Sequence, residues 1–180
     1  MRRSWRPLIV ATTAILLLTI VAAGSGLAHS RNTITAINEL SFEPNKALNV
    51  AFRFKPGTLR IGHGEKLTFQ EGPPIPEAAG QEAHTLSIVA RSDVPQTIDE
   101  ALTCEACGPI LTAHDPDNNG EPPFNPVVNV GKPGLNRPGD SILITPEDPV
   151  ITARVTAPAG TTLRFICVIH PWMQGKLIVE

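Results

Sequence analysis

Residues 165–175 read Phe165-Ile-Cys-Val-Ile-His-Pro-Trp-Met-Gln-Gly175. They place a thiol at Cys167, an imidazole at His170 and a thioether at Met173, close together near the C-terminus. A soft thiolate, an imidazole and a weakly binding thioether form a ligand set that suits copper. The set lacks a second imidazole, so a histidine from elsewhere in the chain is needed to complete it.

His84 is the candidate for the missing imidazole. In residues 84–89, His-Thr-Leu-Ser-Ile-Val, a period of two puts His84, Leu86 and Ile88 on one face of a strand. The same alternation puts Cys167 on the inward face of a strand over 161–167. Two potential ligands therefore lie at strand ends on core-facing sides, which is the arrangement that a preorganised metal site needs.

The rest of the sequence also predicts short strands joined by turns. The 180 residues include 18 Pro and 14 Gly, which argue against long helices. We place residues 29–50 in an N-terminal extension, in which 33–37 and 48–50 could form an edge strand. The main domain covers 51–180, with Gly175 in a turn and further strands at 52–54, 58–61, 66–69, 127–130, 141–144, 150–155 and 176–180.

A segment at about 92–140 is predicted to be an insertion in this domain. Thr97-Ile-Asp-Glu100 has the form of a capping box, so we expect a short helix over 98–102. The stretch from His114 to Pro123 is expected to be irregular, because it is acidic and rich in turn residues.

The N-terminus has the features of an export signal. Three arginines precede an uncharged apolar run over 8–23, and Gly26 and Ala28 suit cleavage after residue 28. We predict a signal peptide over 1–28, with an uncleaved N-terminal membrane anchor as the alternative. Either way the protein is expected outside the cytoplasm, as a periplasmic, secreted or membrane-tethered protein.

The three cysteines fit an oxidising compartment, where thiols pair. Cys104 and Cys107 are best interpreted as a local disulfide, although a redox-active pair or a second metal site with His114 remains open. A local pair would leave Cys167 as a lone thiol, and metal ligation explains a lone thiol in an exported protein. The formal net charge of −2 provides no basic surface, so no nucleic-acid partner is expected.

Three segments together resemble a known family. They are Phe52-Arg-Phe-Lys-Pro56 with its continuation to Phe69, Glu82-Ala-His-Thr-Leu-Ser-Ile88, and Ala157-Pro-Ala-Gly160 through Gly175. They are similar to the opening strands, the first ligand segment and the closing hairpin of the cupredoxins, small blue copper proteins such as plastocyanin and amicyanin. The Cys-x2-His-x2-Met spacing is most similar to that of amicyanin, whereas the insertion departs from the family pattern.

The resemblance implies an all-β fold, a Greek-key β-sandwich carrying a long loop and short-helix insertion. It implies that His84, Cys167, His170 and Met173 bind one type 1 copper ion, with Thr85 among the residues that orient the ligands. The implied function is that of an exported carrier of single electrons, and no enzyme activity is expected because no coordination position is left open.

The resemblance also implies a docking surface. Redox partner proteins would dock near His170 and Trp172, because the family's electrons leave through the second histidine of the site. The alternative function is a copper-binding or copper-delivery module for copper homeostasis or oxidase assembly, which Cys104, Cys107 and His29 would favour. A multicopper oxidase would need further histidine clusters, and five histidines are too few.

Overall fold

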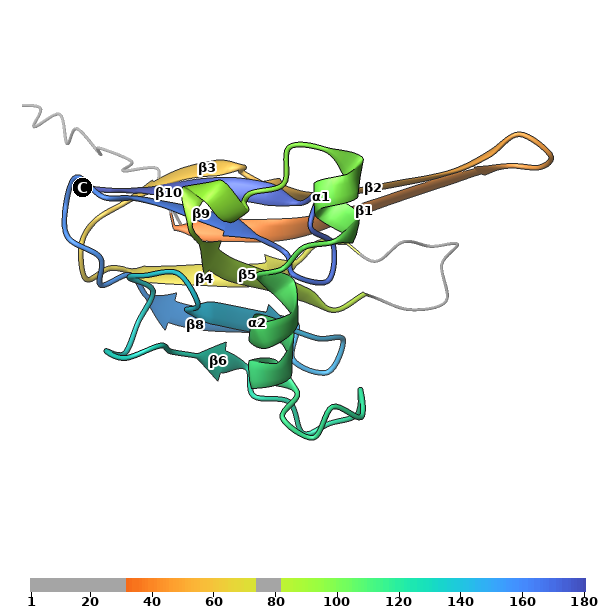
Figure 1. Ribbon diagram of the computed structural model, residues 1–180. Helices are drawn as coiled ribbons and strands as arrows, with labels where there is room; N and C mark the ends of the chain where they lie inside the picture. Colours follow the sequence, from red (N-terminus) through yellow and green to blue (C-terminus); the bar gives the residue numbers. More distant parts are fainter. Residues whose placement is uncertain (1–31, 74–81) are drawn as a thin grey trace, which may run out of the picture.

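The protein is a sandwich of two β-sheets, as the family resemblance implies (Figure 1). The computed structural model describes residues 32–73 and 82–180, so the predicted signal or anchor over 1–28 and residue 29 lie outside the described residues. Within the described ranges, no helix has the length and apolar character needed to cross a membrane.

One sheet has four strands and the other has six. The four-stranded sheet has the order β2 (Ala47–Lys55), β1 (Thr33–Glu43), β4 (Lys66–Glu71) and β8 (Val150–Arg154). The six-stranded sheet has the order β3 (Thr58–Ile61), β10 (Gln174–Val179), β9 (Thr162–Ile166), β5 (His84–Val89), β7 (Ser141–Ile144) and β6 (Val127–Val128). The β1–β4 and β3–β10 pairs are parallel and the other pairs are antiparallel.

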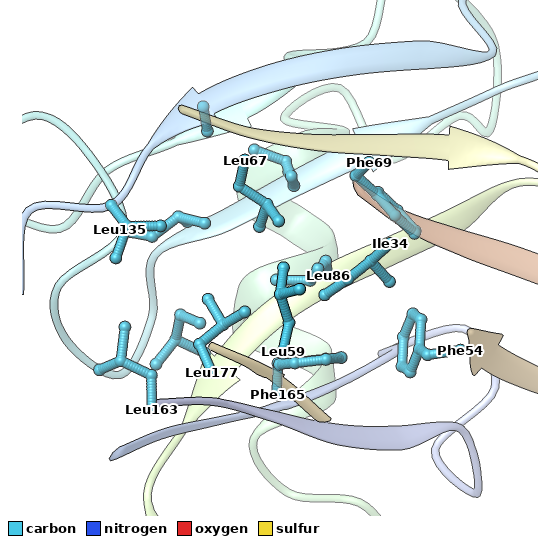
Figure 2. Close-up of a cluster of buried hydrophobic side chains, with 14 of the residues drawn as sticks. Ile34, Phe54, Leu59, Leu67, Phe69, Leu86, Leu135, Leu163, Phe165 and Leu177 are labelled. Carbon is cyan, nitrogen blue, oxygen red and sulfur yellow. The ribbon is translucent and has the colours of Figure 1, made fainter. Parts of the chain in front are cut away.

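The core lies between the two sheets and is built by the predicted alternation. Phe69 and Phe165 are fully buried, one from each sheet, and Phe54 packs between them with ring centroids at 5.9 and 4.9 Å. Figure 2 shows these rings among the aliphatic side chains of the same cluster. Fully burying one such side chain contributes about 1.5–3 kcal/mol, so this core supplies the main stabilisation of the sandwich.

The N-terminal extension takes a larger part in the fold than its weak alternation suggested. Strand β1 lies between β2 and β4, and its Ile34 and Ala36 are fully buried in the core. The boundary predicted before residue 51 falls inside β2. Beyond the sandwich, β1 and β2 continue as a projecting hairpin (Figure 1), near whose tip Phe42 and Leu48 are exposed.

The insertion contains two helices and a disulfide. Helix α1 (Ile98–Leu102) follows a short 3-10 turn (Arg91–Asp93), and the Thr97 side chain accepts a hydrogen bond from the Glu100 N–H, which confirms the predicted cap. Helix α2 (Cys107–His114) was not predicted from the sequence, and it ends on His114, the first residue of the stretch expected to be irregular. Its Gly108 and Pro109 disfavour a helix interior, but they occupy the first turn, where proline is tolerated.

The insertion covers part of the outer face of the six-stranded sheet, over β5 and the end of β9. Cys107 and Ile110 of α2 form a second apolar cluster with Val89, Ile166 and Val168. Strands β5 and β7 are consequently buried on both faces. This cover explains how polar side chains on the outward face of β5 come to be fully buried.

Gly175 lies inside β10 rather than in the predicted turn, and its backbone is tightly packed. A Cβ added there would lie 2.3 Å from the Phe165 ring and 2.8 Å from the Gly57 carbonyl oxygen. We therefore expect Gly175→Ala to lower the free energy of unfolding by about 2 kcal/mol, because an overpacked core forces its neighbours to move.

Gly108→Ala is the matched control for this substitution. Gly108 is exposed in α2 and has no atom within 4 Å of an added Cβ. Alanine there should raise the free energy of unfolding by about 0.5 kcal/mol, since it favours the helical backbone. Urea denaturation of both variants checks the pair, and a Gly175→Ala protein as stable as the parent would contradict the packing.

Candidate metal centre

The predicted ligands meet at one end of the sandwich. His84 is the first residue of β5, and Cys167, His170 and Met173 lie in the turn between β9 and β10. This turn is closed by two backbone hydrogen bonds, from Met173 N–H to the His170 carbonyl at 2.8 Å and from Cys167 N–H to the Met173 carbonyl at 3.0 Å. The turn is therefore a compact element with a fixed backbone.

Three side-chain atoms face one another in this end of the molecule. Sγ of Cys167 lies 3.9 Å from Nδ1 of His84 and 3.7 Å from Nδ1 of His170, and the two Nδ1 atoms are 3.3 Å apart. The point in their plane that is equidistant from all three lies about 2.1 Å from each, the circumradius of a triangle with these sides. Metal bonds to imidazole nitrogen and thiolate sulfur have lengths of about 2.0–2.3 Å.

Burial keeps the two imidazoles and the thiol in their uncharged forms. Desolvation, and for His84 the neighbouring charge of His170, lowers the pKa of both imidazoles to about 4. Burial also raises the pKa of the Cys167 thiol, which hydrogen bonds from Thr85 and from loop backbone groups partly oppose. The imidazoles are thus neutral and ready to donate lone pairs, and a bound cation would favour the thiolate.

Met173 completes the predicted set as a buried neighbour. Its side chain is 1% exposed and belongs to the main apolar cluster, which also contains Cys167. A thioether in such surroundings is a weak, soft ligand that water cannot replace. Glu82, two residues before His84, is exposed and does not belong to the three-residue group.

Aromatic rings shield the group from solvent. The Phe52 ring stands edge-on to both imidazoles, with centroids 5.6 Å from His84 and 4.7 Å from His170. On the outer side, the ring centroid of Trp172 lies 5.3 Å from that of His170 and 6.4 Å from that of Phe52. Sequence analysis missed the role of Phe52, although its alternation with Phe54 pointed it inward.

Thr85 links the two ligand-bearing segments, in the place where the sequence predicted an orienting residue. Its backbone N–H donates to Sγ of Cys167 at 3.4 Å. Its hydroxyl accepts a hydrogen bond from the N–H of Val168 at 2.8 Å. These two contacts fix the sulfur and the backbone just after it relative to β5.

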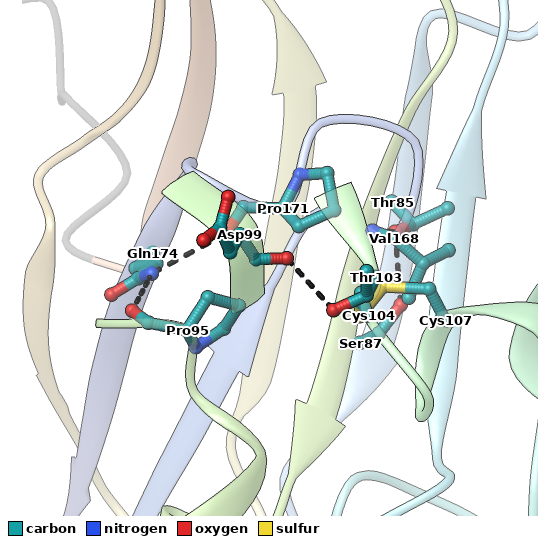
Figure 3. Close-up of a disulfide and its surroundings, with 10 residues drawn as sticks. All are labelled: Thr85, Ser87, Pro95, Asp99, Thr103, Cys104, Cys107, Val168, Pro171 and Gln174. Atoms are coloured by element: carbon teal, nitrogen blue, oxygen red, sulfur yellow. Dashed lines mark hydrogen bonds between the residues drawn. A yellow bond between two sulfur atoms is a disulfide. The ribbon is translucent and has the colours of Figure 1, made fainter. Parts of the chain in front are cut away.

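The other two cysteines are joined to each other. Cys104 and Cys107 form a disulfide between α1 and α2, and Cys167 is the buried free cysteine. Figure 3 shows the disulfide close to Thr85 and Val168, so the insertion lies against the outer side of the ligand segments. The disulfide interpretation is confirmed.

Comparison with known proteins gives matches among solved structures. No protein-family model and no curated protein matches this chain. Plastocyanin from Dryopteris crassirhizoma is 17% identical, with a TM-score of 0.40, covering 82% of this chain and 99% of that chain. Auracyanin A, a blue copper protein from Chloroflexus aurantiacus, is 21% identical, with a TM-score of 0.39, covering 71% of this chain and 89% of that chain.

A purple cupredoxin from Nitrosopumilus maritimus is also similar, at 15% identity and a TM-score of 0.37, covering 82% of this chain and 98% of that chain. The chemistry follows from the site itself: two imidazoles, one thiol and a nearby thioether, which fit one type 1 copper ion.

The lowered pKa values predict how the metal-free protein responds to acid. His84 and His170 bind protons in the unfolded chain below about pH 6.5 but only near pH 4 in the folded chain. The free energy of unfolding should therefore fall as the pH drops from about 6.5 to about 4, by up to about 1.4 kcal/mol per pH unit for each histidine.

Denaturant unfolding at several pH values measures this slope. The comparison should use the Glu71→Gln background, because burial raises the pKa of Glu71 to about 7 and gives the opposite trend. In that background, His170→Gln should reduce the slope by the contribution of one proton. An unchanged slope would contradict the buried, neutral imidazole at His170.

Proposed function

We propose that this chain is an exported type 1 copper protein that carries single electrons by cycling between Cu(I) and Cu(II). The observation that carries the proposal is the buried triangle of two imidazole nitrogens and one sulfur, with room for an ion at bonding distance from all three. His84 and His170 would bind through Nδ1, Cys167 through its thiolate, and Met173 through its weakly binding thioether. When bound, copper supplies the one-electron redox chemistry.

The protein's contribution is to hold the donor atoms still. His84 is fixed at the start of a paired strand, and the other donors lie in the turn closed by the Cys167–Met173 and Met173–His170 hydrogen bonds. The surrounding side chains are buried and leave little freedom for the donors to move. A donor set that keeps one geometry in both oxidation states favours rapid electron transfer over ligand exchange.

His170 is suited to be the electron port. It is 9% exposed, the most exposed of the three donors, and its neighbour Trp172 is 48% exposed. Trp172, Val50, Ile98 and Leu102 line an apolar hollow beside it. We propose that redox partner proteins dock here, because apolar patches of this kind on the surface mark interaction sites.

Export is part of the proposal. It is supported by the signal-peptide pattern over 1–28 and by the Cys104–Cys107 disulfide, which persists in oxidising compartments. The protein would act in the periplasm, in the medium or tethered to the outer face of a membrane by an uncleaved N-terminus. In that setting it would serve as a carrier rather than as an enzyme.

Colour is the direct test of the site. We expect the purified protein loaded with Cu(II) to be intensely blue, because the Cys167 thiolate gives a charge-transfer absorption. Cys167→Ser should abolish the colour. Met173→Leu should keep the colour and shift the reduction potential, since the axial ligand tunes the potential without supplying the thiolate bond.

Voltammetry then separates the carrier from the alternative. A reversible one-electron wave supports the carrier. A colourless protein that binds Cu(I) without a reversible wave would contradict it and favour copper delivery instead. Among the features that would favour delivery, Cys104 and Cys107 are already joined to each other, and His29 lies outside the described residues.

The docking surface has its own test. Trp172→Ala should slow electron exchange with a protein partner at least about tenfold, because aromatic residues often dominate binding at an interface. Exchange with a small inorganic oxidant should change little, since Trp172 is not a ligand. Leu111→Ala is the matched control, an exposed apolar residue on α2 outside the hollow. Equal rates with the protein partner for parent and Trp172→Ala would contradict docking at this surface.

A further inference from the structure

A chain of hydroxyl groups runs behind the metal centre. It consists of Thr85, Ser87 and Ser141, which are all fully buried, and we call it the hydroxyl chain. Oγ of Ser87 lies 2.9 Å from Oγ1 of Thr85 and 2.7 Å from Oγ of Ser141. Ser87 and Ser141 face each other across the β5–β7 pair, so the strand register itself holds the hydroxyls together.

The chain joins the metal centre at one end. Thr85 donates its backbone N–H to the sulfur of Cys167, and its hydroxyl accepts the N–H of Val168. The hydroxyl chain therefore ends at Thr85, the residue whose contacts fix the sulfur of Cys167 and the backbone at Val168.

The other end of the chain reaches the insertion. Nε2 of His114 lies 2.7 Å from Oγ of Ser141, and Nδ1 of His114 lies 2.5 Å from the carbonyl oxygen of Asn125. The His114 side chain is fully buried at the end of α2, and burial lowers its pKa although the Asn125 contact opposes this. A carbonyl oxygen can only accept, so Nδ1 carries a proton and Nε2 shares a second hydrogen bond with Ser141.

Proton counting shows why His114 matters for the whole chain. Each hydroxyl has one proton to donate, so the direction of one hydrogen bond restricts the direction of the next. The imidazole anchors one end of this series, and the Val168 N–H anchors the other. Without His114, the buried hydroxyl of Ser141 would lose a hydrogen-bond partner. The bonds from Ser141 to Ser87 and from Ser87 to Thr85 would then weaken, because the members of such a network polarise one another.

We propose that His114 is a positioning residue for Cys167, acting through the hydroxyl chain. The proposal rests on the proposed function in that Cys167 is the copper ligand. The insertion then has a defined role, because it supplies from outside the sandwich the group that completes the hydrogen bonding behind the sulfur.

The reactivity of Cys167 in the metal-free protein tests the contacts without copper. Cys167 is fully buried, so alkylation by iodoacetamide requires the segment around it to open. His114→Leu and Ser141→Ala should each speed alkylation about tenfold, the factor that corresponds to one lost buried hydrogen bond. His114→Gln, whose side-chain amide can donate or accept a hydrogen bond near the position of Nε2, should restore most of the protection.

Two controls make the result specific. Leu111→Ala changes an exposed side chain on the same helix and should leave the rate unchanged. Ile61→Val removes a core methylene at the far end of the β3–β10 pair and reports the effect of lower global stability alone. The free energy of unfolding of every variant is measured alongside the rate, and Ser141→Ala keeps the test available if His114→Leu fails to fold.

The copper-loaded variants give the second readout. Ser141→Ala and His114→Leu should shift the thiolate-to-copper absorption band and the reduction potential, and His114→Gln should bring both back toward the parent values. Parent-like alkylation rates in both variants, or rates explained by global stability as in Ile61→Val, would overturn the proposal. A parent protein that is not blue would overturn the proposed function instead, while the thiol rates still decide the role of His114.

Discussion

The register between β5 and β9 is the constraint on which the site depends. Ser87 pairs with Ile166 and Ile88 with Phe165, so the start of β5 lies beside the end of β9. This pairing brings His84 to Cys167 across more than eighty residues of sequence. A shift of one residue would turn every side chain of β5 to the other face, and the sulfur of Cys167 would lose the imidazole of His84.

The same register brings three ionisable side chains together in a buried place. Two imidazoles and a thiol are desolvated together, and their pKa values move in the directions that keep all three uncharged. Such a group costs stability unless its lone pairs find a partner. A soft cation provides that partner. Metal binding therefore offsets the free energy that the protein loses by burying these groups.

Much of this site could be predicted from the sequence because its signals are local. The spacing of Cys167, His170 and Met173 is read directly from the sequence. The alternation around His84 required only period-two reasoning. The strands over 58–61, 84–89 and 141–144 are found at the predicted residues. The helix over 98–102 is also where its capping box predicted it.

The features that were missed depend on tertiary contacts. Strand β1 is long because it pairs with β2 on one side and β4 on the other, which its own alternation does not reveal. Helix α2 is held by its apolar contacts and the disulfide rather than by propensity, since it begins Cys107-Gly-Pro. His114 lies at the end of that helix, and no local pattern connects it with Ser141.

The insertion is accordingly more than a loop added to a sandwich. It covers the outward face of β5 and buries Thr85 and Ser87. Without this cover, both side chains would be exposed to water. Its apolar cluster shares Ile166 and Val168 with the segment that carries the sulfur. The metal centre is therefore supported on two sides, by the core of the sandwich and by the layer that the insertion adds.

X-ray absorption spectroscopy at the copper edge tests the central claim most directly, because it reports the donor atoms and their distances in both oxidation states. The account predicts two imidazole nitrogens and one short copper–sulfur bond, with nearly the same distances in Cu(I) and Cu(II) protein. A first shell of oxygen and nitrogen without sulfur, or a donor set that changes between the two states, would contradict it.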